Sequence, residues 1–363
     1  MVLEVAELTK RFGANTILDG ITFSASAGEL VCLAGPSGVG KTTLLRLLAG
    51  LDVPDTGTIT ITPQSGRGAA MAAPGKAAGA AVNTVGSAAG SKAAASASPE
   101  VAAVTATGRA AAGSVAGAAI LVFQDYLLFP HLTAWDNIGF GLRARRVPKQ
   151  AQAQHIGDML DAFHLTGLEK RYPAQLSAGQ RQRVALARAL VCNPAVLLLD
   201  EPFANLDRSL RMETAAFVRD TVRHFGVATI SVTHDLEEAF AIADRLGLLL
   251  DGRLAQLAPP REVYRFPATP EVAGFLGPVV HMDDGLCAAL GLDRGTTPTL
   301  LRPEDLLLTP DADGPAHVVE ARFTGQVTRV VLRCAGQCIV VHTLCNAVLA
   351  GGKVRVTLRP DRP

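Results

Sequence analysis

The strongest constraint on the fold of this chain is a glycine-rich segment at residues 35–42, which lies between two apolar segments. Residues 29–35 read as a buried strand ending in glycine, and the leucine-rich segment 42–50 indicates a helix. Such a loop lets backbone N–H groups turn toward phosphate oxygens at the positive end of the helix. A purely structural turn is the alternative, but the pattern predicts a nucleotide-phosphate site. Its expected residues are Gly35, Pro36, Ser37, Gly38, Val39, Gly40, Lys41, Thr42 and Thr43.

Four side chains have specific predicted roles in this chemistry. Lys41 can reach the β- and γ-phosphates of a bound nucleotide, and the Thr42 hydroxyl can bind Mg²⁺. Asp200 ends another apolar strand at 196–200, and Glu201 follows it directly. Because open α/β sheets gather ligands at the carboxyl ends of their strands, we expect Asp200 to bind Mg²⁺ through water and Glu201 to polarise an attacking water. A solvated strand end is the alternative for this acidic pair.

Alternating strand and helix patterns organise most of the chain. Strands are expected at 3–8, 57–61, 120–123 and 227–235, and helices at 149–164 and 177–192. Such alternation predicts an α/β fold, with a parallel core sheet and helices on both faces. Prolines near 259–267 and the pair Gly277-Pro278 separate a tail with alternating segments at 327–334, 338–344 and 353–359, typical of a small antiparallel β domain. The expected domains are residues 1–276 and 277–363.

Residues 63–119 differ abruptly from their surroundings. They are mostly alanine, glycine and serine, with five charged residues and no aromatic residue. Without bulky side chains, such a segment buries too little surface to offset its ordering entropy. We therefore predict a flexible insertion, with an ordered subdomain as the alternative.

Charge and hydropathy exclude several classes of protein. The formal net charge is +1, from 34 basic and 33 acidic residues, which gives no electrostatic reason to expect nucleic acid as a partner. The first twelve residues alternate and carry charge, so we expect no signal peptide. The apolar runs at 195–199 and 246–250 are far shorter than the ~20 residues needed to span a bilayer, so other chains must supply any membrane-spanning part.

The segment LSAGQRQRVALARAL at 176–190 resembles the signature sequence of ABC (ATP-binding cassette) transporter ATPases, with Ala178 in place of the first glycine. Ser177 suits a helix N-cap, and Gln180 three residues later completes a capping box, so a well-capped helix is the alternative interpretation. In the family this helix start binds the γ-phosphate of ATP held by a partner subunit. The resemblance therefore implies a homodimer in which Ser177, Gly179 and Gln180 of one copy face ATP on the other.

Further segments resemble other motifs of this family, in the family's order. Gln124 resembles the glutamine that contacts Mg²⁺ and the attacking water, and His234 resembles the histidine that contacts the γ-phosphate. Asp207 belongs to a segment like the family's D-loop, although Ala204-Asn205 replaces its usual start. Phe12 fits the aromatic residue that stacks on adenine. A structural histidine and a core phenylalanine are the alternatives for His234 and Phe12.

The resemblance covers roughly residues 1–276 apart from the insertion. It implies a P-loop NTPase core, an antiparallel β portion near the N-terminus and a helical subdomain at 125–190. It also implies permease subunits as partners, with Gln124 and residues 127–138 as the contact. There, Phe129, Pro130 and Leu132 form either an apolar socket or local core.

The tail motif LRPEDLLL at 301–308 resembles the start of the small TOBE-like domain on ATPases of importers for ferric iron, polyamines, molybdate or sulfate. A dimer-stabilising role or an oxyanion sensor are both open for this tail. The expected protein is a peripheral ATPase on the cytoplasmic face of the inner membrane, with a solute-binding protein as an indirect partner. An ABC ATPase acting in DNA repair or translation, or a regulator that does not hydrolyse ATP, are the alternatives.

Overall fold

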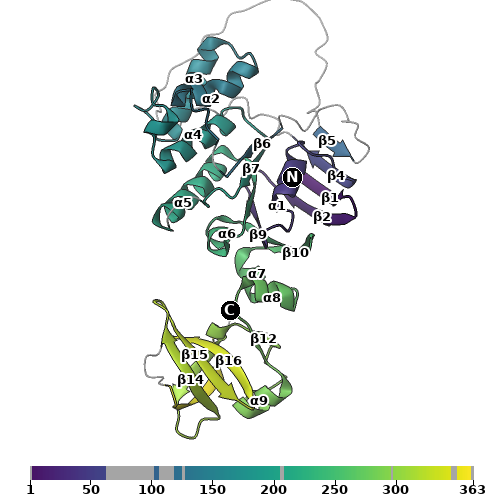
Figure 1. Cartoon of the computed structure of the whole chain (residues 1–363), viewed down its shortest axis with the longest axis vertical. Coiled ribbons are helices and arrows are strands. Elements are labelled where there is room, and N and C mark those ends of the chain that lie inside the picture. Colours follow the sequence, from purple (N-terminus) through teal and green to yellow (C-terminus); the bar gives the residue numbers. More distant parts are fainter. Residues whose placement is uncertain are drawn as a thin grey trace, which may run out of the picture. The chain divides into compact units, whose positions relative to one another are not determined.

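Figure 1 shows the computed structural model of the chain, which describes residues 2–62, 102–105, 118–124, 127–204, 208–295, 297–344 and 350–360. The chain divides into two compact units, Met1–Pro260 and Arg261–Pro363. The break lies earlier than the boundary expected at 276/277. Helices α7 (Pro260–Arg265) and α8 (Pro270–Leu276) belong almost entirely to the second unit.

A six-stranded sheet forms the centre of the first unit. In spatial order its strands are β10 (Arg253–Ala258), β9 (Arg245–Leu250), β3 (Leu30–Ala34), β8 (Ala228–Thr233), β7 (Val196–Asp200) and β6 (Ala119–Val122). All neighbours run parallel except β9 and β10. Strands β3, β7 and β8 are buried at every position, as expected of parallel strands covered on both faces.

An antiparallel sheet completes the β structure of this unit, in the order β2 (Asn15–Ala25), β1 (Leu3–Phe12), β4 (Thr56–Ile61) and β5 (Ala102–Thr105). Strand β5 lies inside the segment predicted to be a flexible insertion and pairs with β4 along its whole length. That prediction is therefore wrong for these four residues, because backbone pairing with β4 orders them although the segment around them is poor in bulky side chains. Residues 63–101 and 106–117 of the predicted insertion lie outside the described residues.

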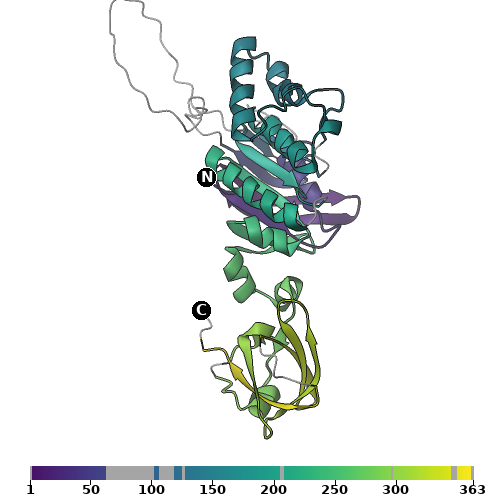
Figure 2. The same cartoon turned by 90° about the vertical axis from the view of Figure 1, so that its left-hand side faces the viewer.

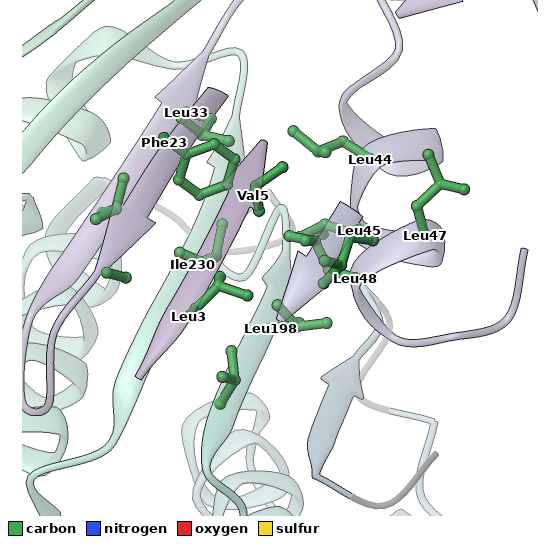
Figure 3. Packing of buried hydrophobic residues seen from close by; sticks show 14 of the residues in the cluster. Leu3, Val5, Phe23, Leu33, Leu44, Leu45, Leu47, Leu48, Leu198 and Ile230 are labelled. Atoms are coloured by element: carbon green, nitrogen blue, oxygen red, sulfur yellow. The ribbon is translucent and has the colours of Figure 1, made fainter. Parts of the chain in front are cut away.

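Helix α1 (Lys41–Leu48) joins the two sheets through one hydrophobic core. Figure 3 shows Leu44, Leu45 and Leu48 of this helix on the side that faces apolar residues of both sheets, such as Val5 and Ile230. The four leucines of α1 have no exposed surface, and burial of a leucine contributes about 1.5–3 kcal/mol. This packing fixes the helix, and with it the loop that precedes it, against the end of β3.

The helical part of the first unit contains α2 (Ala134–Ala144), α3 (Lys149–Ala162) and α4 (Ala178–Leu190), which gather on the side away from the antiparallel sheet (Figure 1). The helices expected at 149–164 and 177–192 thus form, each ending two residues earlier. Two further helices, α5 (Arg208–Phe225) and α6 (Leu236–Ile242), follow β7 and β8. None of the helices in the described ranges is long and apolar enough to cross a membrane.

The second unit is built on a five-stranded antiparallel sheet, whose strands are drawn in green to yellow in Figure 2. Its order is β13 (Leu306–Pro310), β17 (Lys353–Leu358), β14 (Ala316–Phe323), β15 (Thr328–Cys334) and β16 (Gln337–Thr343). The strands expected at 327–334, 338–344 and 353–359 match β15, β16 and β17 to within a residue. A short pair, β11 (Val280–His281) with β12 (Leu300–Leu301), and helix α9 (Asp284–Leu290) complete the unit.

One buried arginine ties α7 and α8 to this β domain. Arg302, only 5% exposed, donates hydrogen bonds to the carbonyl oxygens of Tyr264, Ala273, Gly277 and Pro278. Its guanidinium also lies over the Tyr264 ring, 4.3 Å from the ring centroid. A buried guanidinium needs acceptors for its N–H groups, and here the acceptors are carbonyl oxygens of α7, of α8 and of the residues just after α8. These hydrogen bonds therefore fix the two helices to the β domain of the second unit.

Candidate ATP-hydrolysis site

Four adjacent parallel strands bring most of the predicted site residues to one edge of the central sheet. The glycine-rich loop follows β3, His234 follows β8, Asp200 and Glu201 lie at the end of β7, and Gln124 follows β6. Carboxyl ends of neighbouring parallel strands meet at the same edge, which is where α/β sheets bind ligands. Segments separated by up to about two hundred residues in sequence thereby converge by topology alone.

The glycine-rich loop has no room for side chains at two positions. A Cβ at Gly35 would collide with the carbonyl oxygen of Leu249. Gly40, which caps α1, has a φ of 108° and faces Ile17 and Leu18, so that any side chain would be both strained and obstructed. The loop is therefore held close to the sheet with its backbone N–H groups at the start of α1, the arrangement that binds phosphate.

Lys41 is folded over this loop. Its Nζ donates to the carbonyl oxygens of Gly35 at 2.8 Å and Pro36 at 2.9 Å, and only 6% of the residue is exposed. Burial lowers the pKa of Lys41, while Glu201 and Asp200 act in the opposite direction. The loop thus carries a largely desolvated ammonium group near two carboxyl groups. Its present partners are neutral carbonyl oxygens, and anionic phosphate oxygens would form stronger hydrogen bonds with it.

Thr42 and Asp200 form a second contact between the loop and the sheet. Thr42 Oγ1 lies 3.4 Å from Asp200 Oδ1, and Asp200 is 8% exposed. Burial and the neighbouring Glu201 raise the pKa of Asp200, against the effects of Thr42 and Lys41. Gln124 lies exposed after β6 at the same edge. The site therefore presents a hydroxyl and a buried carboxyl group in contact with each other, and the amide side chain of Gln124 follows the neighbouring strand β6.

Glu201 pairs with His234 across the ends of β7 and β8. The distance from Glu201 Oε1 to His234 Nδ1 is 2.9 Å, and the Glu201 N–H donates to the carbonyl oxygen of Val232 at 3.0 Å. Glu201 adopts a φ of 45°, a left-handed conformation that turns its side chain away from the strand direction. With Nδ1 donating to the carboxylate, the Nε2 side of the imidazole is left for another partner.

The signature segment forms the capping box predicted from the sequence. Ser177 Oγ accepts from the Gln180 N–H at 3.2 Å, and Gln180 Oε1 accepts from the Ser177 N–H at 2.9 Å. A cavity of about 210 Å³ lies against this helix start. It is lined by Ser177, Gly179, Gln180 and Arg183 of α4 and by Glu213, Thr214 and Phe217 of α5. The lining contains none of residues 35–42, so one chain does not bring this cavity and the glycine-rich loop together as one site.

Phe12 is 55% exposed at the end of β1, with Lys10 Nζ 5.3 Å from its ring centroid. A core role for Phe12 is therefore wrong, and its ring is accessible for stacking. Asp207 lies outside the described residues. Sequence reasoning missed Arg211 of α5, which contacts Asp235 and Glu238 next to His234. Its signal was weak, because an arginine among the many charges of residues 208–225 reads as a solvated helix face.

Comparisons with known proteins agree with these observations. The profile of the ABC transporter family matches residues 18–204, and that of the TOBE domain matches residues 299–363. A sulfate/thiosulfate import ATP-binding protein, CysA 2 of Chromobacterium violaceum, is 39% identical, covering 96% of this chain and 88% of that relative. The CysA proteins of Xanthomonas campestris and Bradyrhizobium diazoefficiens are each 37% identical and cover 99% and 100% of this chain, and 98% of each relative.

This chain thus combines the parallel strands, the glycine-rich loop, the acidic pair and the signature helix. Nearly the whole length of the chain matches relatives from this family. The antiparallel tail with its LRPEDLLL segment agrees with the second profile match. The chain belongs to the ABC transporter family, as an ATP-hydrolysing subunit with a C-terminal TOBE domain.

Proposed function

We propose that two copies of this chain hydrolyse Mg²⁺-bound ATP to drive import of sulfate or thiosulfate through membrane-spanning permease subunits. The observation that carries the proposal is the convergence of Lys41, the Thr42–Asp200 contact and the Glu201–His234 pair at one sheet edge. Phosphoryl transfer to water requires a cation, oxygen ligands for a metal ion and an oriented base. Lys41 is the cation here, Thr42 and Asp200 supply the oxygen ligands, and Glu201 is the base that His234 holds.

Each side chain has a separate role in this proposal. Lys41 exchanges its bonds to the Gly35 and Pro36 carbonyls for bonds to phosphate oxygens, where its charge stabilises the transition state. Glu201 accepts the proton of the attacking water through the carboxylate oxygen that His234 does not contact. His234 fixes that carboxylate with Nδ1 and contacts the γ-phosphate from its Nε2 side.

Thr42, Asp200 and Gln124 are the residues that would hold Mg²⁺. Thr42 Oγ1 and Asp200 Oδ1 are oxygen ligands of the kind Mg²⁺ prefers, already in contact with each other. The raised pKa of Asp200 reflects a burial cost that a bound cation offsets. When bound, Mg²⁺ neutralises charge that develops on the phosphate oxygens.

A second copy completes the site in this proposal. The α4 N-terminus and its cavity are separate from the phosphate loop within one chain, which supports a role for Ser177, Gly179 and Gln180 toward ATP on a partner copy. The Ser177 hydroxyl accepts the Gln180 N–H, so its own hydrogen is available to donate to an anion. Ala178 keeps the helix start intact, since the capping box does not depend on the glycine that the family has there.

An apolar surface beside Gln124 supports the permease contact. Phe123 is 41% exposed, Leu127 57% and Phe140 44%, while the rings of Phe129 and Phe140 pack with centroids 4.4 Å apart. Asn137, fully buried, bonds to both N–H and carbonyl of Phe129 and fixes the loop. An exposed apolar surface of this kind suits a helix of a membrane subunit, and it supports a peripheral position of the chain at the cytoplasmic face.

The choice of sulfate or thiosulfate as the solute is supported by the relatives, whose names describe sulfate and thiosulfate import and whose sequences match this chain from cassette to tail. The test is uptake of radiolabelled sulfate in source cells that lack this chain and carry it on a plasmid. Restored uptake is expected with the native chain but not with Glu201→Gln. Restored growth on ferric iron or a polyamine, without sulfate uptake, would identify another solute while leaving the ATPase assignment intact.

A further inference from the structure

Thr233, directly before His234, ends β8 and pairs with Ala34 of β3, and the backbone on both sides of His234 is held further by side-chain hydrogen bonds. Thr233 Oγ1 donates to Glu238 Oε2 at 2.6 Å, and the Asp235 N–H donates to Thr233 Oγ1 at 3.0 Å. Asp235 Oδ1 in turn accepts the N–H groups of Glu237 at 2.8 Å and Glu238 at 3.3 Å, which caps α6. His234 is therefore carried on a short connection whose position depends on the carboxyl groups of Asp235 and Glu238.

A single arginine from another helix bridges these two carboxyl groups. Arg211 Nη1 lies 2.6 Å from Asp235 Oδ2, and Arg211 Nε lies 3.5 Å from Glu238 Oε1. Glu238 is 3% exposed, and burial raises its pKa, whereas Thr233 and Arg211 lower it. Arg211 thus places a positive charge beside a buried carboxyl group and joins the start of α5 to the connection that carries His234.

We propose that Arg211 is a positioning residue for hydrolysis, which sets the place of His234 and, through it, of the Glu201 carboxylate. The inference rests on the roles proposed above for His234 and Glu201. A forked guanidinium contacts two separate carboxyl groups at once, which an ammonium group does less well. Displacement of α5 would therefore change the alignment of His234 without any change at the phosphate-binding loop.

The expected signature is a split between turnover and nucleotide affinity. Arg211→Gln removes the bridge, leaves Glu238 buried without its cation and frees the His234 connection to move. Misalignment of a group that acts in the transition state lowers kcat, here by roughly tenfold or more, while KM for ATP stays within about twofold. Arg211→Lys, which can contact only one carboxyl group well, should fall between the native chain and Arg211→Gln.

A matched control is available on the same helix. Arg223 of α5 pairs with Asp244 at 2.9 Å on an exposed surface, past the end of α6. Arg223→Gln removes an arginine–aspartate pair of α5 without contact to residues 233–238. The experiment measures kcat and KM for Mg²⁺-ATP hydrolysis by the full chain for Arg211→Gln, Arg211→Lys, Arg223→Gln, His234→Ala and the double variant Arg211→Gln/His234→Ala.

If Arg211 acts through His234, Arg211→Gln costs about tenfold in the native background and less than about twofold in the His234→Ala background. A full loss in both backgrounds, an equal loss in Arg223→Gln, or a rise in KM that matches the fall in kcat would each overturn the inference. If Arg211→Gln does not fold, the same cycle is run with Arg211→Lys. Unchanged turnover in His234→Ala would instead refute the proposed role of His234, on which the inference depends.

Discussion

The Nδ1 atom of His234 lies 2.9 Å from Oε1 of Glu201, across the ends of two adjacent parallel strands. Glu201 reaches this position through a left-handed backbone conformation at the end of β7, and its N–H is bonded to Val232 of β8. The carboxylate therefore has one oxygen fixed by the imidazole and one directed elsewhere. This division is what a general base needs, because the base must be oriented without being fully occupied.

Replacement of Glu201 by glutamine is expected to separate binding from hydrolysis. The amide oxygen of glutamine can still accept the His234 Nδ1–H, so the geometry is preserved while the base is lost. We expect ATP binding within about twofold of the native chain and turnover reduced by about a hundredfold or more. Equilibrium binding of ATP and steady-state phosphate release measure the two quantities, and substantial phosphate release by this variant would exclude Glu201 as the base.

Asp200→Asn is expected to stabilise the nucleotide-free chain. Burial raises the pKa of Asp200 above the ordinary value of 3.8, so the folded protein binds this proton more tightly than the unfolded chain does. Charging Asp200 therefore costs free energy of unfolding. This cost is absent at a pH below the ordinary pKa, where the carboxyl group is protonated in both states, and it is fully present once the pH exceeds the raised pKa of the folded protein. The thermal midpoint of the variant should therefore exceed that of the native chain at pH 7, by a margin that shrinks as the pH falls toward 4.

ATP binding by the Asp200→Asn variant should no longer depend on Mg²⁺. An amide in place of the Asp200 carboxylate is a poorer ligand for a hard divalent cation, so ATP binding should respond little to added Mg²⁺. Val39→Ala serves as the control, because Val39 lies in the glycine-rich loop and its side chain has no oxygen that could bind a metal ion. A Mg²⁺ titration of ATP binding that is identical in Asp200→Asn and the native chain would contradict the proposed metal site.

Arg302→Leu is expected to destabilise the second unit by about 3–5 kcal/mol, because removal of a buried hydrogen-bonded charge leaves four carbonyl oxygens without their donor. Arg355, which pairs with Asp311 on the surface, provides the control, and Arg355→Ala should cost no more than about 1 kcal/mol. Denaturant unfolding followed on both variants measures the difference. Equal effects of the two substitutions would show that the buried guanidinium contributes no more than a surface ion pair.

Leu127→Asp is expected to impair the permease contact without affecting basal hydrolysis. Leu127 is 57% exposed, so the fold should tolerate the charge, whereas a desolvated apolar contact should not. Leu344, 78% exposed in the second unit, offers a matched control as Leu344→Asp. We expect Leu127→Asp alone to reduce recovery of permease subunits with the purified chain by roughly tenfold. Equal recovery with both variants would place the permease contact elsewhere.

Much of this fold follows from the sequence, because buried parallel strands and glycine-rich loops leave strong local patterns. Strands β3 and β7 and the start of α1 were located to within a residue or two, and topology then brought Lys41 and Asp200 to one edge. The 2.9 Å pairing of Glu201 with His234 did not follow, since local propensity indicates neither the left-handed φ of Glu201 nor the bond of its N–H to Val232 of β8.

Two departures have tertiary causes. The strand at Ala102–Thr105 was missed because its two β-forming residues, Val104 and Thr105, lie within a long segment of alanine, glycine and serine, and only its pairing with β4 reveals it. The bridge from Arg211 to Asp235 and Glu238 was missed because it joins residues more than twenty positions apart on helices whose relative placement a single sequence does not specify. Both features depend on neighbours in space and leave little trace along the chain.

The hydrogen bonds of Arg302 have a practical consequence for anyone who exchanges tails between ATPases of this family. In a chimera joined at the composition break, after residue 276, Arg302 would come from one parent, and the Tyr264 and Ala273 carbonyl oxygens that it contacts would be replaced by those of the other parent. A junction after Pro260 keeps donor and acceptors from the same parent. The transferable module is thus about sixteen residues longer at its start than the change in composition indicates, and its two short helices should travel with the tail.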